Sequence, residues 1–504
     1  MSLKLYNTLT SQKEEFIPLQ PKKIRMYVCG VTVYDKCHLG HARANVAFDV
    51  IYRYLKHRFP DHQIEFVRNF TDVDDKIIQR SNEQKIPWQE LTEKYIAEFH
   101  NDMRALGNGS PTLEPKATEH IPQMLQLIQK LIDKGIAYTA DGDVFYRVKN
   151  FKDYGKLSGK NIEDLESGAR VDIREAKENP LDFVLWKAAK PDEPSWDSPW
   201  GKGRPGWHIE CSAMGMKYLG ESFDIHGGGR DLIFPHHENE IAQSEGATGK
   251  HFVKYWLHNG FVNINAEKMS KSLGNFFSIQ DILKQYDWEV VRAFLLSVHY
   301  RSPIDFSDQN LHDMGEALER YYTTIKRVRE FLNGPSPENP AAFPHPSRGE
   351  GVDLPSPMAG EGENTLSNIL SSFQQAMDDD FNTAAVFGLL FESVREVNKM
   401  LDQIQVGARQ AAPLQEFLSN LEKISSVLGC FQPDAAAFFS RTQTRAVKDQ
   451  NLDESKILQL IEERKQARLS KNWKRSDEIR NELAQMNIVL KDKPDGSVEW
   501  SVKG

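Results

Sequence analysis

The sequence predicts an α/β fold in which a doubly wound parallel sheet is followed by an α-helical bundle and a small C-terminal α+β unit. Three observations lead to this prediction. Strand-like and helix-like segments alternate near the N-terminus, helical periodicity dominates after residue 278, and residues 453–504 contain two amphipathic helical segments and a short strand-like one. Alternation of strands with helices is typical of a parallel sheet with right-handed crossovers.

The alternating segments follow one another in order. Residues 23–30 (KIRMYVCG) carry apolar side chains at alternate positions and end on a glycine, which predicts a buried strand. Residues 44–55 show helical spacing of apolar residues, and residues 63–70 (QIEFVRNF) are typical of a second strand. Residues 72–84 predict a helix with acidic residues in its first turn. The pattern therefore indicates a Rossmann-like domain, of the kind that binds nucleotides.

We expect this domain to cover residues 1–277 and to contain an insertion near residues 120–206. Residues 137–148 (AYTADGDVFYRV) predict a hairpin, because its Asp-Gly dipeptide suits a type I′ turn. The segment that follows, up to residue 206, is rich in Pro, Gly, Trp and charge and does not continue the sheet. The parallel pattern resumes with WHIECSAMGMKYLG, FDIHGGG and VKYWLHNGFV.

The remaining chain divides into a helical part and a final unit. We expect helix to follow helix in residues 278–333 and again in residues 364–430, which together form a helical bundle. Residues 334–363 are mostly Pro, Gly, Ser, Ala and Glu, which predicts a flexible linker. Residues 453–504 form the last predicted domain, with two amphipathic helices up to LKD and a strand at GSVEW.

Composition limits the class of protein. A chain of 504 residues suggests about three domains. No apolar run approaches the ~20 residues that cross a bilayer, and no leader segment precedes the domain, so we expect a soluble cytoplasmic protein without a membrane partner. Four scattered cysteines also fit a reducing compartment. The net charge of -9 argues against nucleic-acid binding over the whole surface, but it leaves room for a local basic face.

The segment FPHHENEIAQSE carries two histidines and two glutamates in five consecutive positions. On a helix, His236 and Glu240 share one face while His237 and Glu238 turn aside, so the first pair could bind a metal. A polar helix start with a solvated acidic face is the alternative. The HExxH pattern of zinc hydrolases is excluded, because Ile241 stands where its second histidine should be. Other ligands must come from elsewhere in the chain.

Two further motifs suggest phosphate chemistry. CHLGHAR places His38 and His41 around Gly40 at the expected junction of strand and helix, where main-chain N–H groups and the helix dipole favour phosphate. EKMSKSLGN places Lys268 and Lys271 in a small cationic loop suited to a charged oxygen group. Each motif alone has an ordinary alternative, a pair of capping histidines or a solvated turn, but together they flank the predicted sheet.

HLGH and KMSKS resemble the two signatures of class I aminoacyl-tRNA synthetases. The segments MYVCGVTVYD, RPGWHIECSAM, FDIHGGGRDLIFPHHENEIAQSE and DDDFNTAAVFGLLFE are similar to segments of the cysteinyl-tRNA synthetase family, and the similarity covers nearly the whole chain except the linker. Leu39 stands where that family more often has isoleucine, a volume-conserving change. The resemblance implies a monomeric enzyme that activates L-cysteine with ATP and transfers it to the 3′ end of tRNA(Cys). It also implies that the helical bundle of residues 278–333 and 364–430 binds the tRNA.

The resemblance also implies a zinc ion at the base of the amino-acid pocket, one per chain, with four ligands: Cys29, Cys211, His236 and Glu240. Two thiolates, an imidazole and a carboxylate are a ligand set that suits zinc. His237 and Cys37 are expected to pack without binding it. Four protein ligands are also typical of a purely structural zinc, which remains an alternative. A working zinc would bind the substrate thiolate, and so separate cysteine from serine, which shape alone separates by only ~1–3 kcal/mol.

By the same resemblance, the two signature motifs supply the catalytic residues: His38, His41, Lys268 and Lys271. The histidines would hydrogen-bond the phosphates of ATP and the lysines would close over the pyrophosphate, with Mg²⁺ accompanying the nucleotide. The implied ATP-binding residues are Gly40, Gly227, Gly228, Asp231 and Lys271. A plain tight turn is the alternative for FDIHGGGRD. The implied substrate-binding residues are Gly30, Thr71 and Trp207.

The final unit supplies RKQARLSKNWKR, a basic run around one tryptophan in an acidic chain. The resemblance implies that this unit reads the anticodon; a solvated helix face is the alternative. The basic residues are Arg464, Lys465, Arg468, Lys471, Lys474 and Arg475, with Trp473 among them. Two rival functions remain open. One is a related ligase that joins cysteine to an amino-sugar, but this ligase lacks the C-terminal unit. The other is a non-enzymatic RNA-binding protein stabilised by zinc, which would not need the lysines of KMSKS.

Overall fold

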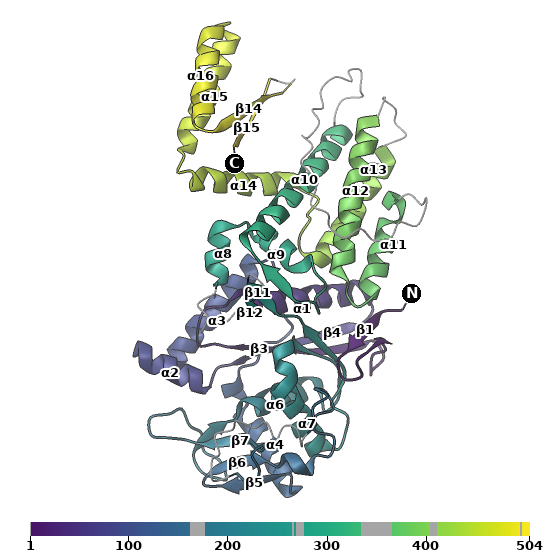
Figure 1. Ribbon diagram of the computed structural model, residues 1–504, viewed down its shortest axis with the longest axis vertical. Coiled ribbons are helices and arrows are strands. Elements are labelled where there is room, and N and C mark those ends of the chain that lie inside the picture. The colour runs from purple at the N-terminus through teal and green to yellow at the C-terminus, as the bar shows by residue number, and fades with distance from the viewer. Residues whose placement is uncertain are drawn as a thin grey trace. The chain divides into compact units, whose positions relative to one another are not determined.

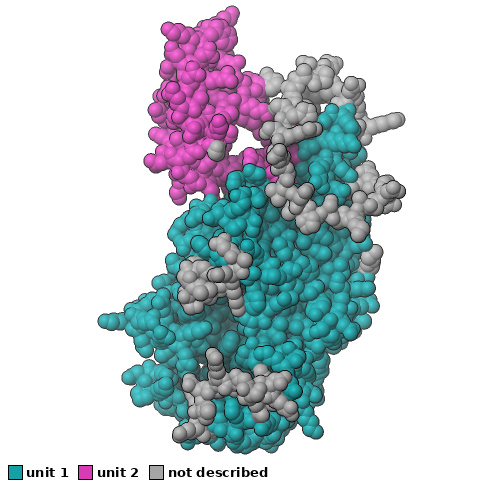
Figure 2. All heavy atoms as spheres, viewed as in Figure 1, with its two compact units in different colours: residues 1–318, 338–431 teal, residues 319–337, 432–504 magenta. Residues whose placement is uncertain are grey.

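The computed structural model describes residues 2–161, 177–264, 267–268, 277–333, 365–403, 411–493 and 496–503. The chain divides into two compact units, residues 1–318 with 338–431 and residues 319–337 with 432–504 (Figure 2). The linker predicted at residues 334–363 lies outside the described residues. The three-domain division made from the sequence stays a prediction.

A four-stranded parallel sheet in the order β10-β9-β3-β4 forms the centre of the first unit. Its strands are β3 (Lys23–Thr32), β4 (Gln63–Thr71), β9 (Phe223–Gly229) and β10 (Val253–Asn259). Helix α1 (Leu39–Arg58) packs on one face, and α6 (Trp207–Leu219) with α7 (Glu238–Thr248) packs on the other (Figure 1). Strands and helices therefore alternate as the sequence predicts, and the α/β fold class is confirmed.

The insertion has a sheet of its own, antiparallel in the order β5-β6-β7-β8. Asp141 and Gly142 have φ angles of 52° and 85°, as the predicted type I′ turn requires. Strands β7 and β8 were not predicted, because their Pro-, Gly- and Trp-rich surroundings mask the alternation. The strands of this sheet are β5 (Ala137–Ala140), β6 (Asp143–Tyr146), β7 (Phe183–Ala188) and β8 (Gly203–Pro205).

The expectation that only helices follow residue 278 is wrong at one point. The short strand β13 (Ile304–Phe306) pairs in parallel with β11 (Val262–Ile264), which in turn pairs with β12 (Glu267–Lys268). Three residues are too few to show a period of two. The helices around it are α8 (Ile279–Gln285), α9 (Trp288–Leu296) and α10 (Asp308–Asn333).

The first unit also contains an N-terminal hairpin, six further helices among the described residues and short 3-10 turns. The N-terminal hairpin pairs β1 (Lys4–Asn7) with β2 (Gln12–Glu15). The other helices are α2 (Asp75–Gln84), α3 (Trp88–Ala105), α4 (Ile121–Asp133), α11 (Thr365–Asp378), α12 (Thr383–Gln403) and α13 (Ala411–Leu428). The 3-10 turns are Ala117–His120, Val148–Asn150 and Arg230–Leu232.

The second unit combines the C-terminal part of α10 with α14 (Ala435–Asp449), α15 (Glu454–Leu469) and α16 (Trp473–Gln485). The chain ends in a hairpin of β14 (Ile488–Asp492) and β15 (Val498–Val502). Residues 488–492 were expected in the second helix and form a strand instead. A small apolar core lies between these elements: Ile457, Leu460, Ile479, Leu483 and Ile488. Among the described residues, no helix is long and apolar enough to cross a membrane.

Candidate active site and metal centre

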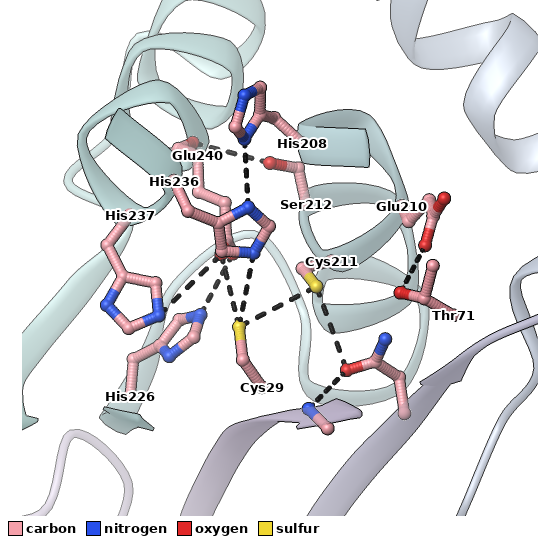
Figure 3. Close-up of polar contacts among 12 residues, drawn as sticks. Cys29, Thr71, His208, Glu210, Cys211, Ser212, His226, His236, His237 and Glu240 are labelled. Atoms are coloured by element: carbon pink, nitrogen blue, oxygen red, sulfur yellow. Dashed lines mark hydrogen bonds and ion pairs between the residues drawn. The ribbon is translucent and has the colours of Figure 1, made fainter. Parts of the chain in front are cut away.

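The carboxyl ends of the parallel strands form the edge where open α/β sheets bind their ligands. Cys29 and Gly30 lie near the end of β3, Thr71 ends β4, and the glycines of FDIHGGG end β9. The pairing of β3 with β4 shifts register between Val28 and Val31. A bulge of this kind re-aims side chains, and Cys29 points toward the start of α7 (Figure 3).

Four donor side chains from distant parts of the sequence converge at this edge: Cys29, Cys211, His236 and Glu240 (Figure 3). All their donor atoms lie within 4.8 Å of one another. Cys29 Sγ lies 3.6 Å from Cys211 Sγ, 3.4 Å from His236 Nε2 and 3.3 Å from Glu240 Oε1. The predicted sharing of one face by His236 and Glu240 is confirmed, because His236 Nε2 and Glu240 Oε1 are 3.0 Å apart.

The spacing of these donors fits a single four-coordinate ion. Ligand bonds of 2.0–2.3 Å to zinc place the corners of a tetrahedron ~3.3–3.8 Å apart. Three of the separations, 3.3, 3.4 and 3.6 Å, lie within that range, and the fourth, 3.0 Å, lies just below it. Two sulfurs, one imidazole nitrogen and one carboxylate oxygen are also the donor types that zinc accepts.

Two histidines that contact the cluster, His208 and His226, were missed by sequence reasoning. His208 Nδ1 lies 2.8 Å from His236 Nδ1, and His226 Nε2 lies 2.9 Å from Glu240 Oε2. His226 and His237 also form a second possible donor group with the shared Cys29 and Glu240. The expectation that His237 only packs beside the site therefore stays a prediction. His226 had no sequence signal beyond its place in a buried strand.

The protonation of the cluster without a metal follows from burial and close charges. Burial alone raises the pKa of Glu240, but His226 and His236 outweigh it and hold that pKa at about 2. Burial lowers the pKa of His236, yet Glu240 and Cys211 bring it to about 10. Burial raises the pKa of Cys211, whereas hydrogen bonds from Cys29 and His236 lower it to about 6. Burial and Cys211 raise the pKa of Cys29 well above its usual value. A metal that binds both sulfurs must therefore displace protons.

Each of the three expected substrate residues makes a defined contact. Trp207 stacks on the His236 ring at 4.3 Å between centroids and keeps 40% of its surface exposed. The Thr71 hydroxyl donates to Glu210 Oε2 at 2.7 Å. The Gly30 N–H donates to Asn69 Oδ1 at 2.9 Å, an oxygen 3.7 Å from Cys211 Sγ. Asn69 and Glu210, which sequence reasoning did not single out, thus fix the positions of the pocket residues.

His38 and His41 lie at the N-terminus of α1, as expected. His38 Nδ1 accepts a hydrogen bond from the Gly40 N–H at 3.0 Å, and His41 Nδ1 accepts one from the His38 N–H at 3.4 Å. Their rings stack at 3.7 Å. The capping alternative is therefore confirmed, and a cap at a helix N-terminus is compatible with a nearby phosphate.

The second signature is only partly described. Lys268 belongs to β12, where it pairs with Asn263 of β11, and Lys271 lies outside the described residues. Ser278, just after this motif, forms an isolated antiparallel β-bridge with His38. The Ile279 N–H donates to the Cys37 carbonyl at 3.1 Å. The flanks of the two signatures are thus in direct contact.

Packing accounts for the glycines expected at the adenosine site. A Cβ on Gly227 would lie 2.2 Å from the Phe48 ring, and one on Gly228 would lie 2.9 Å from His237. Both belong to β9 and not to a tight turn, and Asp231 is exposed in the 3-10 turn that follows. A role of these residues toward ATP stays a prediction.

The basic run of the second unit is partly neutralised within that unit. Arg464 donates two hydrogen bonds to Asp492, at 2.7 and 2.9 Å, and Arg468 forms an ion pair with the same carboxylate at 2.6 Å. Arg475 donates to Glu463 at 2.9 Å. Trp473, at the start of α16, keeps 58% of its surface exposed. The expectation that this basic run and Trp473 contact RNA stays a prediction.

The fold resembles that of solved aminoacyl-tRNA synthetases. One is Mycobacterium tuberculosis methionyl-tRNA synthetase in complex with methionyl-adenylate, with a TM-score of 0.56, 16% identity, and coverage of 81% of this chain and 90% of that one. Another is a putative arginyl-tRNA synthetase from Campylobacter jejuni, with a TM-score of 0.55, 11% identity, and coverage of 82% and 94%. The model of the class I (C) tRNA synthetase catalytic domain matches residues 15–316. The chain is a class I aminoacyl-tRNA synthetase.

More similar relatives define the group within this class. Models of the DALR domain and of the cysteinyl-tRNA ligase anticodon binding domain match residues 372–432 and 454–500. The cysteine–tRNA ligase of Geotalea uraniireducens (strain Rf4) is 54% identical, and that of Geobacter metallireducens (strain ATCC 53774 / DSM 7210 / GS-15) is 52% identical; both matches cover 100% of each chain. The chain belongs to the cysteine–tRNA ligase family.

Proposed function

We propose that the protein joins L-cysteine to tRNA(Cys) in two steps. The cysteine carboxylate attacks the α-phosphate of ATP, which forms cysteinyl-adenylate and releases pyrophosphate. The terminal ribose hydroxyl of the tRNA then attacks the adenylate carbonyl and releases AMP. The observation that carries the proposal is the convergence of four metal-binding side chains at the carboxyl edge of the sheet, in a chain that belongs to this family. A monomeric state and a cytoplasmic location remain predictions.

The proposed zinc ligands are Cys29, Cys211, His236 and Glu240, and their spacing supports this role. Bound there, zinc supplies a site that prefers sulfur, which separates cysteine from serine by chemistry and not by shape. His208 and His226 contact ligands through their ring nitrogens, at 2.8 and 2.9 Å, and so hold His236 and Glu240 in orientation. Trp207 covers the His236 ring.

For the ATP half of the site, the proposal relies on positioning and charge neutralisation. His38 and His41 present the N-terminus of α1 to the phosphates, and Lys268 and Lys271 neutralise the leaving pyrophosphate together with Mg²⁺. Gly40 leaves room for the adenosine. The remaining proposed contacts are Gly227, Gly228 and Asp231 with adenosine, and Gly30, Thr71 and Trp207 with cysteine. The second unit is proposed to read the anticodon through its basic run and Trp473.

The test is exchange of labelled pyrophosphate into ATP, run with cysteine and with serine, followed by charging of tRNA. We expect exchange with cysteine and almost none with serine. Lys271→Ala should nearly abolish the exchange while the metal content stays unchanged, because this lysine contacts ATP and not the metal. Lys250→Ala removes an exposed lysine paired with Glu221 and serves as the control.

Two results would contradict the proposal. Undiminished exchange in Lys271→Ala would remove this lysine from the site, and equal exchange with serine would remove the metal from substrate selection. Exchange without tRNA charging would favour the rival ligase that joins cysteine to an amino-sugar. The match of the anticodon binding domain to residues 454–500 supports charging.

A further inference from the structure

Arg43 is a buried arginine on α1, two residues after His41, with 1% of its surface exposed. Among the described residues, the hydrogen bonds of its guanidinium all go to main-chain carbonyls. Nη2 donates to Val298 at 3.2 Å, to His299 at 2.8 Å and to Ser302 at 3.5 Å, and Nη1 donates to Leu295. A buried arginine held only by carbonyls needs a source of negative potential.

The C-terminus of α9 supplies that potential. The helix ends at Leu296, and its last carbonyls have no partner within the helix. They also carry the negative end of the helix dipole. Burial lowers the pKa of Arg43 to about 10, so the side chain keeps its charge at neutral pH. Arg43 thus caps α9 and holds the 297–303 turn that follows it.

The same turn is attached on its other side to the strands that lead to the second signature. The Gly260 N–H donates to the Tyr300 carbonyl at 2.8 Å, and the Ile304 N–H donates to the Phe261 carbonyl at 2.9 Å. Strand β13 continues this contact by pairing with β11, and β11 pairs with β12, which contains Lys268. The turn therefore connects the helix that begins at the HLGH motif with the hairpin that ends at the KMSKS motif.

We propose that Arg43 is a positioning residue for adenylate formation, which holds the HLGH motif in register with the β11–β12 hairpin through the 297–303 turn. It acts through other groups, because its own hydrogen bonds end on this turn and on Leu295. The inference rests on the proposed function, since it assigns both motifs to ATP. The metal cluster lies on β3, on α6, on the helical turn Ile233–His237 and on α7 that follows it. Arg43 should therefore affect the ATP half of the site and leave the cysteine half intact.

The first test is Arg43→Lys in the full-length protein, with pyrophosphate exchange measured at varied ATP and cysteine. A lysine keeps the charge but has no planar fork to reach several carbonyls at once. Displacement of one phosphate-binding motif by ~1 Å costs ~100-fold in rate. We expect the kcat of exchange to fall by about that factor, with an unchanged KM for cysteine and unchanged metal content.

Arg25→Lys is the matched control. Arg25 is also a buried arginine that caps a helix, since its Nη1 donates to the Leu219 carbonyl at the end of α6. It lies near the start of β3, at the edge of the sheet opposite the site. Both variants should lose thermal stability, but Arg25→Lys should keep the exchange rate of the unmodified protein at temperatures below its unfolding.

Gly260→Ala is a second variant, which disturbs the same turn from its other side. It tests the inference independently if Arg43→Lys fails to fold. A Cβ at Gly260 would lie 2.2 Å from the Ser302 carbonyl oxygen and 2.7 Å from Pro303 N, so the turn must move away from β11. We expect the same loss of kcat without a change in the KM for cysteine. Because both substitutions act on one turn, the double variant should be no slower than the slower single variant.

The possible outcomes separate the two proposals. If the unmodified protein shows no cysteine-dependent exchange, the proposed function fails. If it exchanges normally and Arg43→Lys or Gly260→Ala does too, despite lower stability, Arg43 has only a structural role and the inference fails. A rise in the KM for cysteine equal to the loss in rate, or multiplied losses in the double variant, would also overturn it.

Discussion

At the scale of single residues, buried carboxyl groups differ in what surrounds them. Both oxygens of Glu240 face histidine nitrogens at 2.9 and 3.0 Å, and its pKa is low. Asp102 on α3 has 3% of its surface exposed, and its Oδ2 has no hydrogen-bond partner among the described residues. Burial raises the pKa of Asp102 to about 6, because a charged carboxylate is costly away from water. The histidines keep the first carboxyl ionised, and the second destabilises the fold once it ionises.

From the raised pKa of Asp102 we predict that its replacement by asparagine increases the stability of the folded protein in a pH-dependent way. Between pH 3.8, its ordinary pKa, and about pH 6, the folded protein binds more protons at this group than the unfolded chain does. Stability therefore falls as pH rises through this window, and the loss persists above it. Asp102→Asn should raise the free energy of unfolding at pH 7.5 by roughly 1–3 kcal/mol and give no gain at pH 3.5, as measured by urea unfolding.

The control for this prediction is Asp281→Asn, because hydrogen bonds from Lys284 and Ser278 lower the pKa of the exposed Asp281. Its substitution should lower stability at pH 7.5, the opposite sign. A gain for Asp102→Asn that is the same at both pH values would show that ionisation is not the cause.

At the scale of elements, the bulged end of β3 sets the geometry of the site. The shift in register falls between Val28 and Val31, and it brings Gly30 against β4. A Cβ on Gly30 would lie 1.6 Å from the Asn69 carbonyl oxygen, so no other residue fits without movement of a strand. The backbone at this point determines where the Cys29 sulfur lies.

Gly30→Ala should therefore disrupt both metal binding and catalysis. We expect loss of bound metal and a fall in cysteine-dependent exchange of at least ~100-fold, because the strand that carries Cys29 must shift by more than 1 Å. Metal analysis and exchange measure the two effects. Gly315→Ala is the control, since a Cβ there meets only Val290 Cγ2 at 3.9 Å. Retained metal in a folded Gly30→Ala variant would contradict the account.

The elements also indicate what the sequence could predict. Strands β3 and β4, helix α1 and the turn at Asp141 and Gly142 follow from local periodicity and turn chemistry, and the contact between His236 and Glu240 follows from helical spacing. Strand β13 is only three residues long and forms because β11 is available to pair with it. Asn69 and His226 become partners of the site through contacts with distant residues, which no local pattern contains.

At the scale of the whole molecule, the two compact units have separate apolar cores. The core of the second unit lies between α15, α16 and β14, and the residues of the candidate active site all belong to the first unit. Adenylate formation and anticodon reading should therefore be separable by substitution.

Trp473→Ala tests this separation. Stacking of a base on an aromatic side chain contributes ~1–3 kcal/mol, so the efficiency of tRNA charging should fall roughly 5- to 150-fold while pyrophosphate exchange stays unchanged. Leu458→Ala on α15, also half exposed, is the control and should leave both activities intact. Equal charging by Trp473→Ala and the unmodified protein would mean that this tryptophan contacts no base.

The order of the four donors along the chain has a consequence for how the protein is made. Cys29 leaves the ribosome early, Cys211 follows 182 residues later, and His236 and Glu240 come last. A nascent chain that stops short of position 240 has an incomplete set, so the proposed metal site can form only after nearly half of the polypeptide has been synthesised. Until then, the Cys29 thiol lacks at least one of the three other side chains of the proposed site.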